Sequence, residues 1–113
     1  MRAGTLREKI RTEQRTSVSD GGGGSIDAWQ TVNSGIFAGI LAKSGSEKLL
    51  EQRLKGIVVH EITVRYSSNT TGINTDMRIV NERSGEVYNI SAVLPDTRRR
   101  FLVITATTGT ASG

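Results

Sequence analysis

Few residues in this chain could carry out chemistry. His60 is the single histidine and there is no cysteine, so a Ser-His-Asp triad would have to use His60, and thiolate or histidine-rich metal sites are excluded. His60 lies between Val58 and Ile62 on the apolar side of an alternating pattern, which favours a partly buried structural imidazole over a catalytic base or an interface switch. The aspartates lack the spacing of a calcium loop or a carboxylate pair; they are Asp20, Asp27, Asp76 and Asp96. We therefore expect no enzyme activity, no metal and no cofactor.

Arg98, Arg99 and Arg100 form the densest cluster of positive charge. Because arginine donors suit phosphates and carboxylates alike, three interpretations stay open: a solvated turn, pairing with a neighbouring protein, or contact with nucleic acid. The net charge is +4, and the excess lies in this cluster and in the first fifteen residues. A continuous basic platform for nucleic acid is not indicated.

Asp20 is followed by four glycines and Ser25. A phosphate-binding loop would need a Lys-Ser or Lys-Thr pair opening a helix after the glycines, whereas Ile26, Asp27, Ala28 and Trp29 come next. Four consecutive glycines lose much backbone entropy on ordering. The sequence therefore predicts a flexible loop over residues 20–25.

The elements that position these residues are short strands and one helix. Alternating apolar residues predict strands at 10–16, 57–66, 77–81, 86–93 and 101–107, with a long strand at 28–41 that can bend at Gly35 and Gly39. A capping box with Ser44 as N-cap and Glu47 as its partner predicts a helix over 47–55. We expect a mainly β fold: a small closed β-barrel of five or six antiparallel strands with one short helix and extended loops.

The length of 113 residues predicts a single domain over residues 1–113. Within it we expect an N-terminal arm at 1–9, the glycine-rich loop at 20–25, a helix-bearing loop at 41–56 and a flexible tail at 107–113. Apolar residues are 35% of the chain and aromatic residues 4%, so aliphatic side chains must build the core with help from Trp29, Phe37, Tyr66, Tyr88 and Phe101. A monomer should be marginally stable and gain from burial against neighbouring copies.

Two apolar features have a structural and a functional interpretation. Leu49, Leu50 and Leu54 could form a partner-binding helix face, but a short amphipathic helix that covers the open end of its own barrel is favoured. Trp29 is expected to be a core or lid residue before a ligand-stacking one. No stretch is long and apolar enough for a membrane span, and the lack of cysteine fits assembly in a bacterial cytoplasm.

Short motifs spread in order over about residues 1–106 resemble the phage head-tail joining family, also described as head-closure, stopper or head-tail adaptor proteins. They are Met1–Ile10, Asp20–Gly23 before Ala28–Val32, Phe37–Ile40, Ser44–Glu47, Thr63–Tyr66, Met77–Ile79, Tyr88–Ile90 and Arg98–Leu102. The chain departs from the family at Ile36-Phe37, where a Trp is frequent, and at 67–75, which is richer in Ser, Asn and Thr.

This resemblance implies a structural protein of the virion neck, in a tailed phage or a phage-like particle such as a gene transfer agent. It implies a homo-oligomeric ring that closes the DNA-filled capsid, below a portal or adaptor ring and above a tail terminator or tail tube, with packaged double-stranded DNA passing non-specifically. Contacts with neighbouring subunits are then expected at Arg2, Leu6, Arg7, Lys9, Arg98, Arg99 and Arg100. Channel-facing or inter-ring residues are expected at Ser44, Glu47, Lys48, Glu51, Arg53 and Lys55.

Two other function classes remain as alternatives. A small OB-like nucleic-acid-binding protein would display exposed aromatic residues for base stacking, and the few aromatic residues are expected to be needed in the core. A small hydrolase would have to depend on His60. We expect neither a membrane partner nor a small-molecule substrate.

Overall fold

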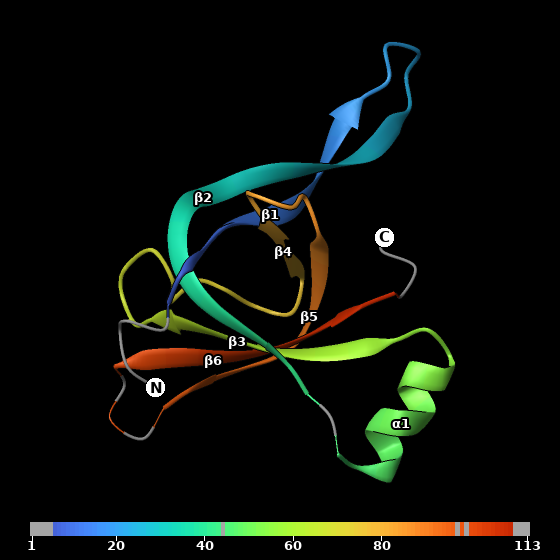
Figure 1. The fold of residues 1–113 in the computed structure, drawn as a ribbon. Helices are drawn as coiled ribbons and strands as arrows, with labels where there is room; N and C mark the ends of the chain where they lie inside the picture. The colour runs from blue at the N-terminus through green and yellow to red at the C-terminus, as the bar shows by residue number, and fades with distance from the viewer. Residues whose placement is uncertain (1–5, 44, 97, 99, 110–113) are drawn as a thin grey trace.

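The computed structural model describes residues 6–43, 45–96, 98 and 100–109. Within these residues, six strands and one helix follow in chain order: β1 (Glu8–Ser19), β2 (Ser25–Ala42), α1 (Glu47–Leu54), β3 (Val58–Arg65), β4 (Met77–Asn81), β5 (Val87–Pro95) and β6 (Phe101–Thr108). The strands form one antiparallel sheet in the order β1-β2-β3-β6-β5-β4, and β4 pairs again with β1, so the sheet closes into a barrel (Figure 1). The expected mainly β fold with one short helix is confirmed.

The core is built from aliphatic side chains that alternate along the strands. Ile62 and Val64 of β3 and Ile104 of β6 are fully buried. Of the five aromatic residues expected in the core, Tyr88 is buried, whereas Phe37 and Tyr66 are exposed and Trp29 and Phe101 are half-buried. That expectation was wrong for Phe37 and Tyr66; the core is made mainly of aliphatic residues from the strands.

Strand β2 is long and bent, as the sequence predicted. Its register with β1 shifts between the pairs Ile10↔Ile36 and Thr12↔Asn33, and Gly35 lies inside this bulge with φ +67. A bulge bends its strand, and positive φ is least costly for glycine. The bend lets one strand pair with β1 along its first part and with β3 along its last part (Figure 1).

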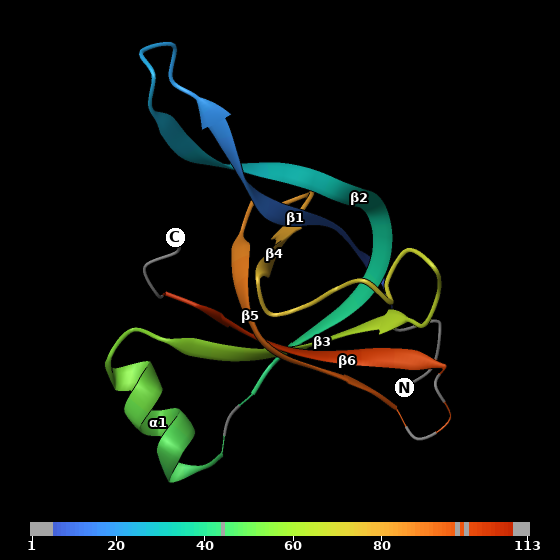
Figure 2. The same ribbon diagram turned by 180° about the vertical axis from the view of Figure 1, so that it is seen from behind.

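The outer halves of β1 and β2 extend beyond the barrel as a two-stranded ribbon. β4 pairs only with residues 10–14 of β1 and β3 pairs only with residues 38–42 of β2, so residues 15–29 form a projecting hairpin (Figures 1 and 2). Asp20 organises its tip, because its Oδ1 accepts hydrogen bonds from the backbone N–H groups of Gly22 at 2.8 Å and Gly24 at 3.1 Å. The predicted loop is therefore a hairpin turn, and Ser25 already belongs to β2.

The ends of the domain are more regular than predicted. The proposed arm at 1–9 is too long, because β1 begins at Glu8 and Leu6 is buried. The proposed tail at 107–113 is also too long, because Thr107 and Thr108 pair with Val59 and Val58 of β3. Backbone hydrogen bonds extend both strands to residues whose small or polar side chains did not predict a strand.

Helix α1 stands beside the barrel and does not close it (Figure 1). Its N-cap is Ser46, whose Oγ accepts a hydrogen bond from Leu49 N at 3.1 Å. The prediction of Ser44 as N-cap was therefore wrong, and Ser44 itself lies outside the described residues. None of the helical residues is buried, which also overturns the idea that α1 covers the barrel end. No helix in the described ranges is long and apolar enough to cross a membrane.

Candidate assembly surfaces

The basic residues near the N-terminus lie in different environments. Lys9 is exposed on β1, with its Nζ 5.3 Å from the centre of the Phe37 ring. Arg7 is also exposed, whereas Leu6 is buried in its own domain and cannot also contact another subunit. Arg2 lies outside the described residues. Lys9 and Arg7 are thus the basic residues of this N-terminal segment that the structure places at the surface.

The basic cluster lies in the turn between β5 and β6. Asp96 shapes this turn, because its Oδ1 accepts hydrogen bonds from the backbone N–H groups of Arg100 at 2.8 Å and Phe101 at 3.4 Å. Arg98 and Arg100 are exposed, and Arg99 lies outside the described residues. Tyr66 N donates to Arg100 O, so the turn lies beside the end of β3 and brings Arg65 near Arg100.

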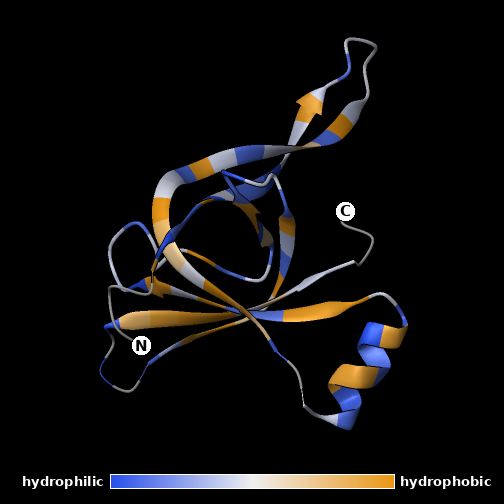
Figure 3. Ribbon diagram, in the orientation of Figure 1, coloured by the Kyte–Doolittle hydropathy of each residue, from blue (hydrophilic) through white to orange (hydrophobic). Residues whose placement is uncertain are grey.

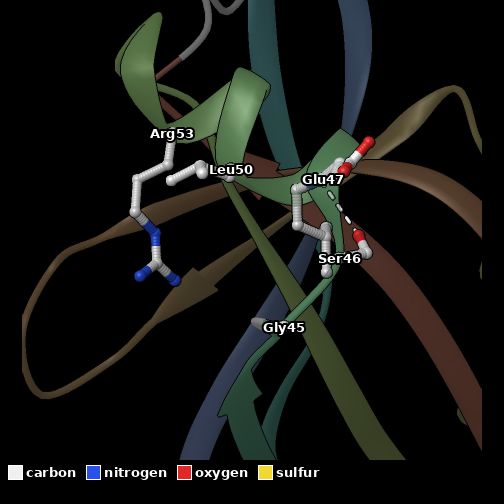
Figure 4. A pocket seen from close by; sticks show the side chains of 6 residues that line it. Gly45, Ser46, Glu47, Leu50 and Arg53 are labelled. Carbon is white, nitrogen blue, oxygen red and sulfur yellow. Dashed lines mark hydrogen bonds between the residues drawn. The ribbon is translucent and has the colours of Figure 1, made fainter.

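Helix α1 presents the expected charged residues to solvent; Glu47, Lys48, Glu51, Arg53 and Lys55 are all exposed. A pocket at the start of the helix is lined by Gly45, Ser46, Glu47, Leu49, Leu50 and Arg53 (Figure 4). One Arg53 nitrogen donates to Lys43 O at 3.2 Å, which ties the helix to the end of β2. Leu54 is 80% exposed, so this apolar side chain of the helix is in contact with solvent.

His60 has the structural environment that the sequence predicted. It is half-buried on β3, and its ring meets that of Tyr88 edge to face with centroids 5.0 Å apart. Its Nδ1 is buried and has no hydrogen-bond partner. Burial lowers the pKa of His60 below its ordinary value, and the charge of Glu86 opposes this shift only in part. A neutral imidazole packed on Tyr88 follows from this arrangement.

A network around Glu13 was not anticipated. Its buried carboxylate accepts from Arg11 Nε at 2.9 Å and from Arg78 Nε at 2.7 Å. Burial would raise the pKa of Glu13, but the hydrogen bonds and charges of the two arginines outweigh it, and the pKa is lowered. Arg78 also stacks 4.3 Å from the Trp29 ring centre, and Arg15 lies at 5.2 Å. Trp29 is therefore an arginine-packing residue outside the core, which its sequence position did not reveal.

Exposed apolar residues were also missed. Phe37, Leu41 and Leu94 are 53%, 59% and 66% exposed on the outside of the barrel. In β2, Ile36, Ala38 and Ile40 alternate on the inner side, and this alternation leaves Phe37 and Leu41 outside once the inner side is known. Within the described residues, no cluster of three or more His, Cys, Asp or Glu could hold a metal ion.

The fold recurs in two solved structures. Protein SF1141 from Shigella flexneri 2a, solved in solution, matches with a TM-score of 0.70 and 26% identity over 99% of this chain and 100% of that chain. A chain from the virion of a native gene transfer agent particle matches with a TM-score of 0.64 and 23% identity over 95% of this chain and 97% of that chain. A search of curated proteins finds no match.

The sequence profile of the phage head completion proteins matches residues 1–109. The described residues form a small closed barrel with exposed basic and apolar side chains. The chain belongs to the phage head completion protein family. It is therefore a structural component of a phage or phage-like virion.

Proposed function

We propose that this protein forms a homo-oligomeric ring in the virion neck, where it closes the DNA-filled capsid and provides the surface to which the tail docks. The observation that carries the proposal is the match of the head completion family over residues 1–109. The role is structural and needs neither a catalytic residue nor a cofactor. Assembly would take place in the cytoplasm of the bacterial host.

The exposed surfaces support a protein that works next to other copies. A small barrel with a projecting hairpin and an uncovered helix leaves apolar side chains in water, including Leu50 and Leu54 of α1 and Leu94 of β5. Contacts repeated around a ring would bury such residues and would sum many weak interactions into a stable joint. The partners would be a portal or adaptor ring on one side and a tail terminator or tail tube on the other.

The charged residues receive roles within this proposal. Arg98 to Arg100, with Arg7 and Lys9, would contact neighbouring subunits or rings, because exposed arginines pair well with carboxylates. The helix-bearing segment 41–56 would face the channel or the adjacent ring, and its charged side chains would contact passing DNA without sequence preference. Arg2 and Ser44, which the sequence also suggested, would belong to the same two groups.

The test is a complementation of tail joining. A phage lacking this gene should accumulate DNA-filled heads without tails, and purified protein should add to those heads and restore joining with purified tails, as seen by electron microscopy and plaque counts. Heads that mature and join tails normally without the protein would contradict the proposal. Deletion of residues 1–9 is unsuitable because it would remove buried Leu6 and the start of β1; Arg98→Ala with Arg100→Ala, both exposed, tests the turn.

A nucleic-acid-binding protein is the alternative. Phe37 and Tyr66 are exposed, so the argument that the core needs all aromatic residues does not hold. However, Trp29 already packs on Arg78 and Arg15, so its ring is not open for a base to stack on. The alternative predicts tight binding of single-stranded DNA with a steep salt dependence that falls when Arg98 and Arg100 become Ala.

A further inference from the structure

The projecting hairpin, residues 15–29, leaves apolar side chains exposed to solvent. Val18 and Ile26 are directly opposed across the two strands and are 42% and 56% exposed. Figure 3 shows hydrophobic segments on both strands of this hairpin, away from the barrel. A two-stranded ribbon with open edges is marginally stable by itself and readily accepts another chain. The hairpin is acidic, because Asp20 at its tip and Asp27 within β2 are the charged residues between Thr16 and Ala28.

A second apolar surface lies on the outside of the barrel, across β2, β3, β6 and β5. Side chains alternate along each strand, so the outward neighbours of the buried core residues form this outer face; they are Phe37, Leu41, Thr63, Val103 and Leu94. The strand register places Thr63 opposite Gly39 and Val103, and Val103 opposite Leu94. Thr63 is only 3% exposed, so the larger outward side chains already pack around it.

The rim of the outer face is basic. Lys9 Nζ lies over the Phe37 ring, exposed Arg65 pairs with Phe101 in the register of β3 and β6, and exposed Arg98 and Arg100 lie in the adjoining turn. One acidic residue also lies near this face: Glu61 of β3, which is opposite Leu41 in the register of β2 and β3. The outer face thus has exposed apolar side chains and a positively charged rim. Both properties are complementary to the apolar and acidic residues of the hairpin.

We propose that the hairpin of one copy docks on the outer face of the next copy in the ring. Val18 and Ile26 pack against Phe37, Leu41 and Leu94, and the acidic tip lies against the basic rim. The inference rests on the proposed ring and specifies its subunit contact.

The structure favours a second copy of this chain as the partner that binds the hairpin. The two surfaces match in apolar character and in opposite charge, and they are different surfaces of the same chain, so the contact is heterologous and can repeat until a ring closes. A hairpin-to-hairpin contact would instead be two-fold, would end at two copies, and would bring Asp20 and Asp27 of both copies together. It would also leave Phe37, Leu41 and Leu94 in water.

Disulfide trapping tests the contact directly, because the chain has no cysteine. The double variant Val18→Cys with Leu94→Cys, assembled on tailless heads and mildly oxidised, should give a ladder of covalent multimers on non-reducing gels. The matched control is Val32→Cys with Leu94→Cys, since Val32 is also on β2 and 46% exposed but lies outside the hairpin. A control ladder as strong as that of the test pair would overturn the assignment.

Charge exchange gives a second, independent measurement. Asp27→Lys should lower the fraction of assembled protein at least tenfold, and Arg65→Glu in the same chain should restore much of it. Thermal unfolding of the monomer should be unchanged in both variants, because both positions are exposed. Loss of assembly without rescue by Arg65→Glu contradicts the pairing of the hairpin with the basic rim.

The outcomes separate this inference from the proposed function. If rings form and heads are joined normally while Val18→Asp with Ile26→Asp has no effect, the hairpin contact is wrong and the neck function stands. If the same variant still forms rings but no longer adds to heads, the hairpin binds a different virion protein and the inference is overturned. If the unaltered protein neither forms rings nor joins heads, the proposed function itself fails.

Discussion

The backbone N–H of Gly35 donates a hydrogen bond to Glu82 Oε1 at 2.6 Å. This bond joins the bulge of β2 to the turn between β4 and β5, two places 47 residues apart in sequence. The bulge leaves a backbone donor outside the strand ladder, and the carboxylate satisfies it. The bend that directs β2 from β1 to β3 is therefore supported by the β4–β5 turn, which lies on the other side of β1.

Glu82→Ala should lower the free energy of unfolding by about 1 kcal/mol, since an exposed charged hydrogen bond is lost and water replaces it in part. Urea denaturation at neutral pH measures the change. Glu51→Ala on the exposed helix is the matched control and should change stability by less than about 0.5 kcal/mol. Equal effects at the two positions would contradict a supporting role for Glu82.

Glu13→Gln should destabilise the barrel by about 1 to 3 kcal/mol at neutral pH, because two arginines lose the charge of a buried carboxylate. The pKa of Glu13 is lowered in the folded protein. Its contribution is therefore complete above the pKa of the unfolded chain, about 4.3, and is lost as the pH falls through the lower folded value.

Urea titrations of both proteins from pH 7 to pH 3 test this dependence, and the difference between Glu13→Gln and the parent should shrink toward the acid end. Glu8→Gln is the control: Glu8 pairs with Arg83 at 3.0 Å, but the Arg83 side chain is 81% exposed. Its loss should matter little. A constant difference across the pH range would count against the ionised Glu13 network.

His60→Leu should make stability less dependent on pH between about 7 and 5. The folded pKa of His60 is lowered by burial, so the unfolded chain takes up the proton first and the folded state loses stability as the pH falls below about 6.5. Leucine cannot take up a proton. Melting temperatures at pH 7 and pH 5 measure the effect, and an unchanged drop in the variant would mean that another group titrates.

Gly109→Ala should destabilise the junction between β6 and the end of the helix-bearing segment. A Cβ at this position would overlap the carbonyl oxygen of Gly56, and Gly109 has φ +84. We expect a loss of about 1 kcal/mol or more. Gly72→Ala is the control, because a Cβ there meets open space without positive φ, and it should be neutral or slightly stabilising in thermal unfolding.

Much of the architecture could be predicted from the chain. The alternation over Val58 to Arg65 and over Phe101 to Thr107 marked strands because successive side chains point to opposite sides of a sheet. Gly85 lies in the β4–β5 turn with φ +77, a conformation that glycine adopts at little cost. Helix α1 was placed at the correct first residue, but its N-cap was assigned to Ser44, because Ser44 and Glu47 have capping-box spacing, whereas Ser46 caps Leu49 N without an acidic residue at that position.

The candidate surfaces were predicted less completely. The basic turn at Arg98 and Arg100 and the charged helix are exposed as expected, whereas Leu6 is buried. The hairpin as a projecting element and the outer face were not foreseen. Strand lengths beyond the barrel depend on pairing between residues far apart, and alternation alone does not say which of two apolar neighbours, such as Ile36 and Phe37, turns inward.

The sequence by itself determined that this is a small, mainly β, cysteine-free domain of the head completion type, because periodicity, turn residues and ordered motifs are local properties of the chain. Only the tertiary structure decided which apolar residues stay outside, where Glu13 finds its two arginines, and that the outer part of the β1–β2 hairpin projects beyond the barrel. These features arise when the sheet closes, since closure fixes which strand edges are used and which remain open.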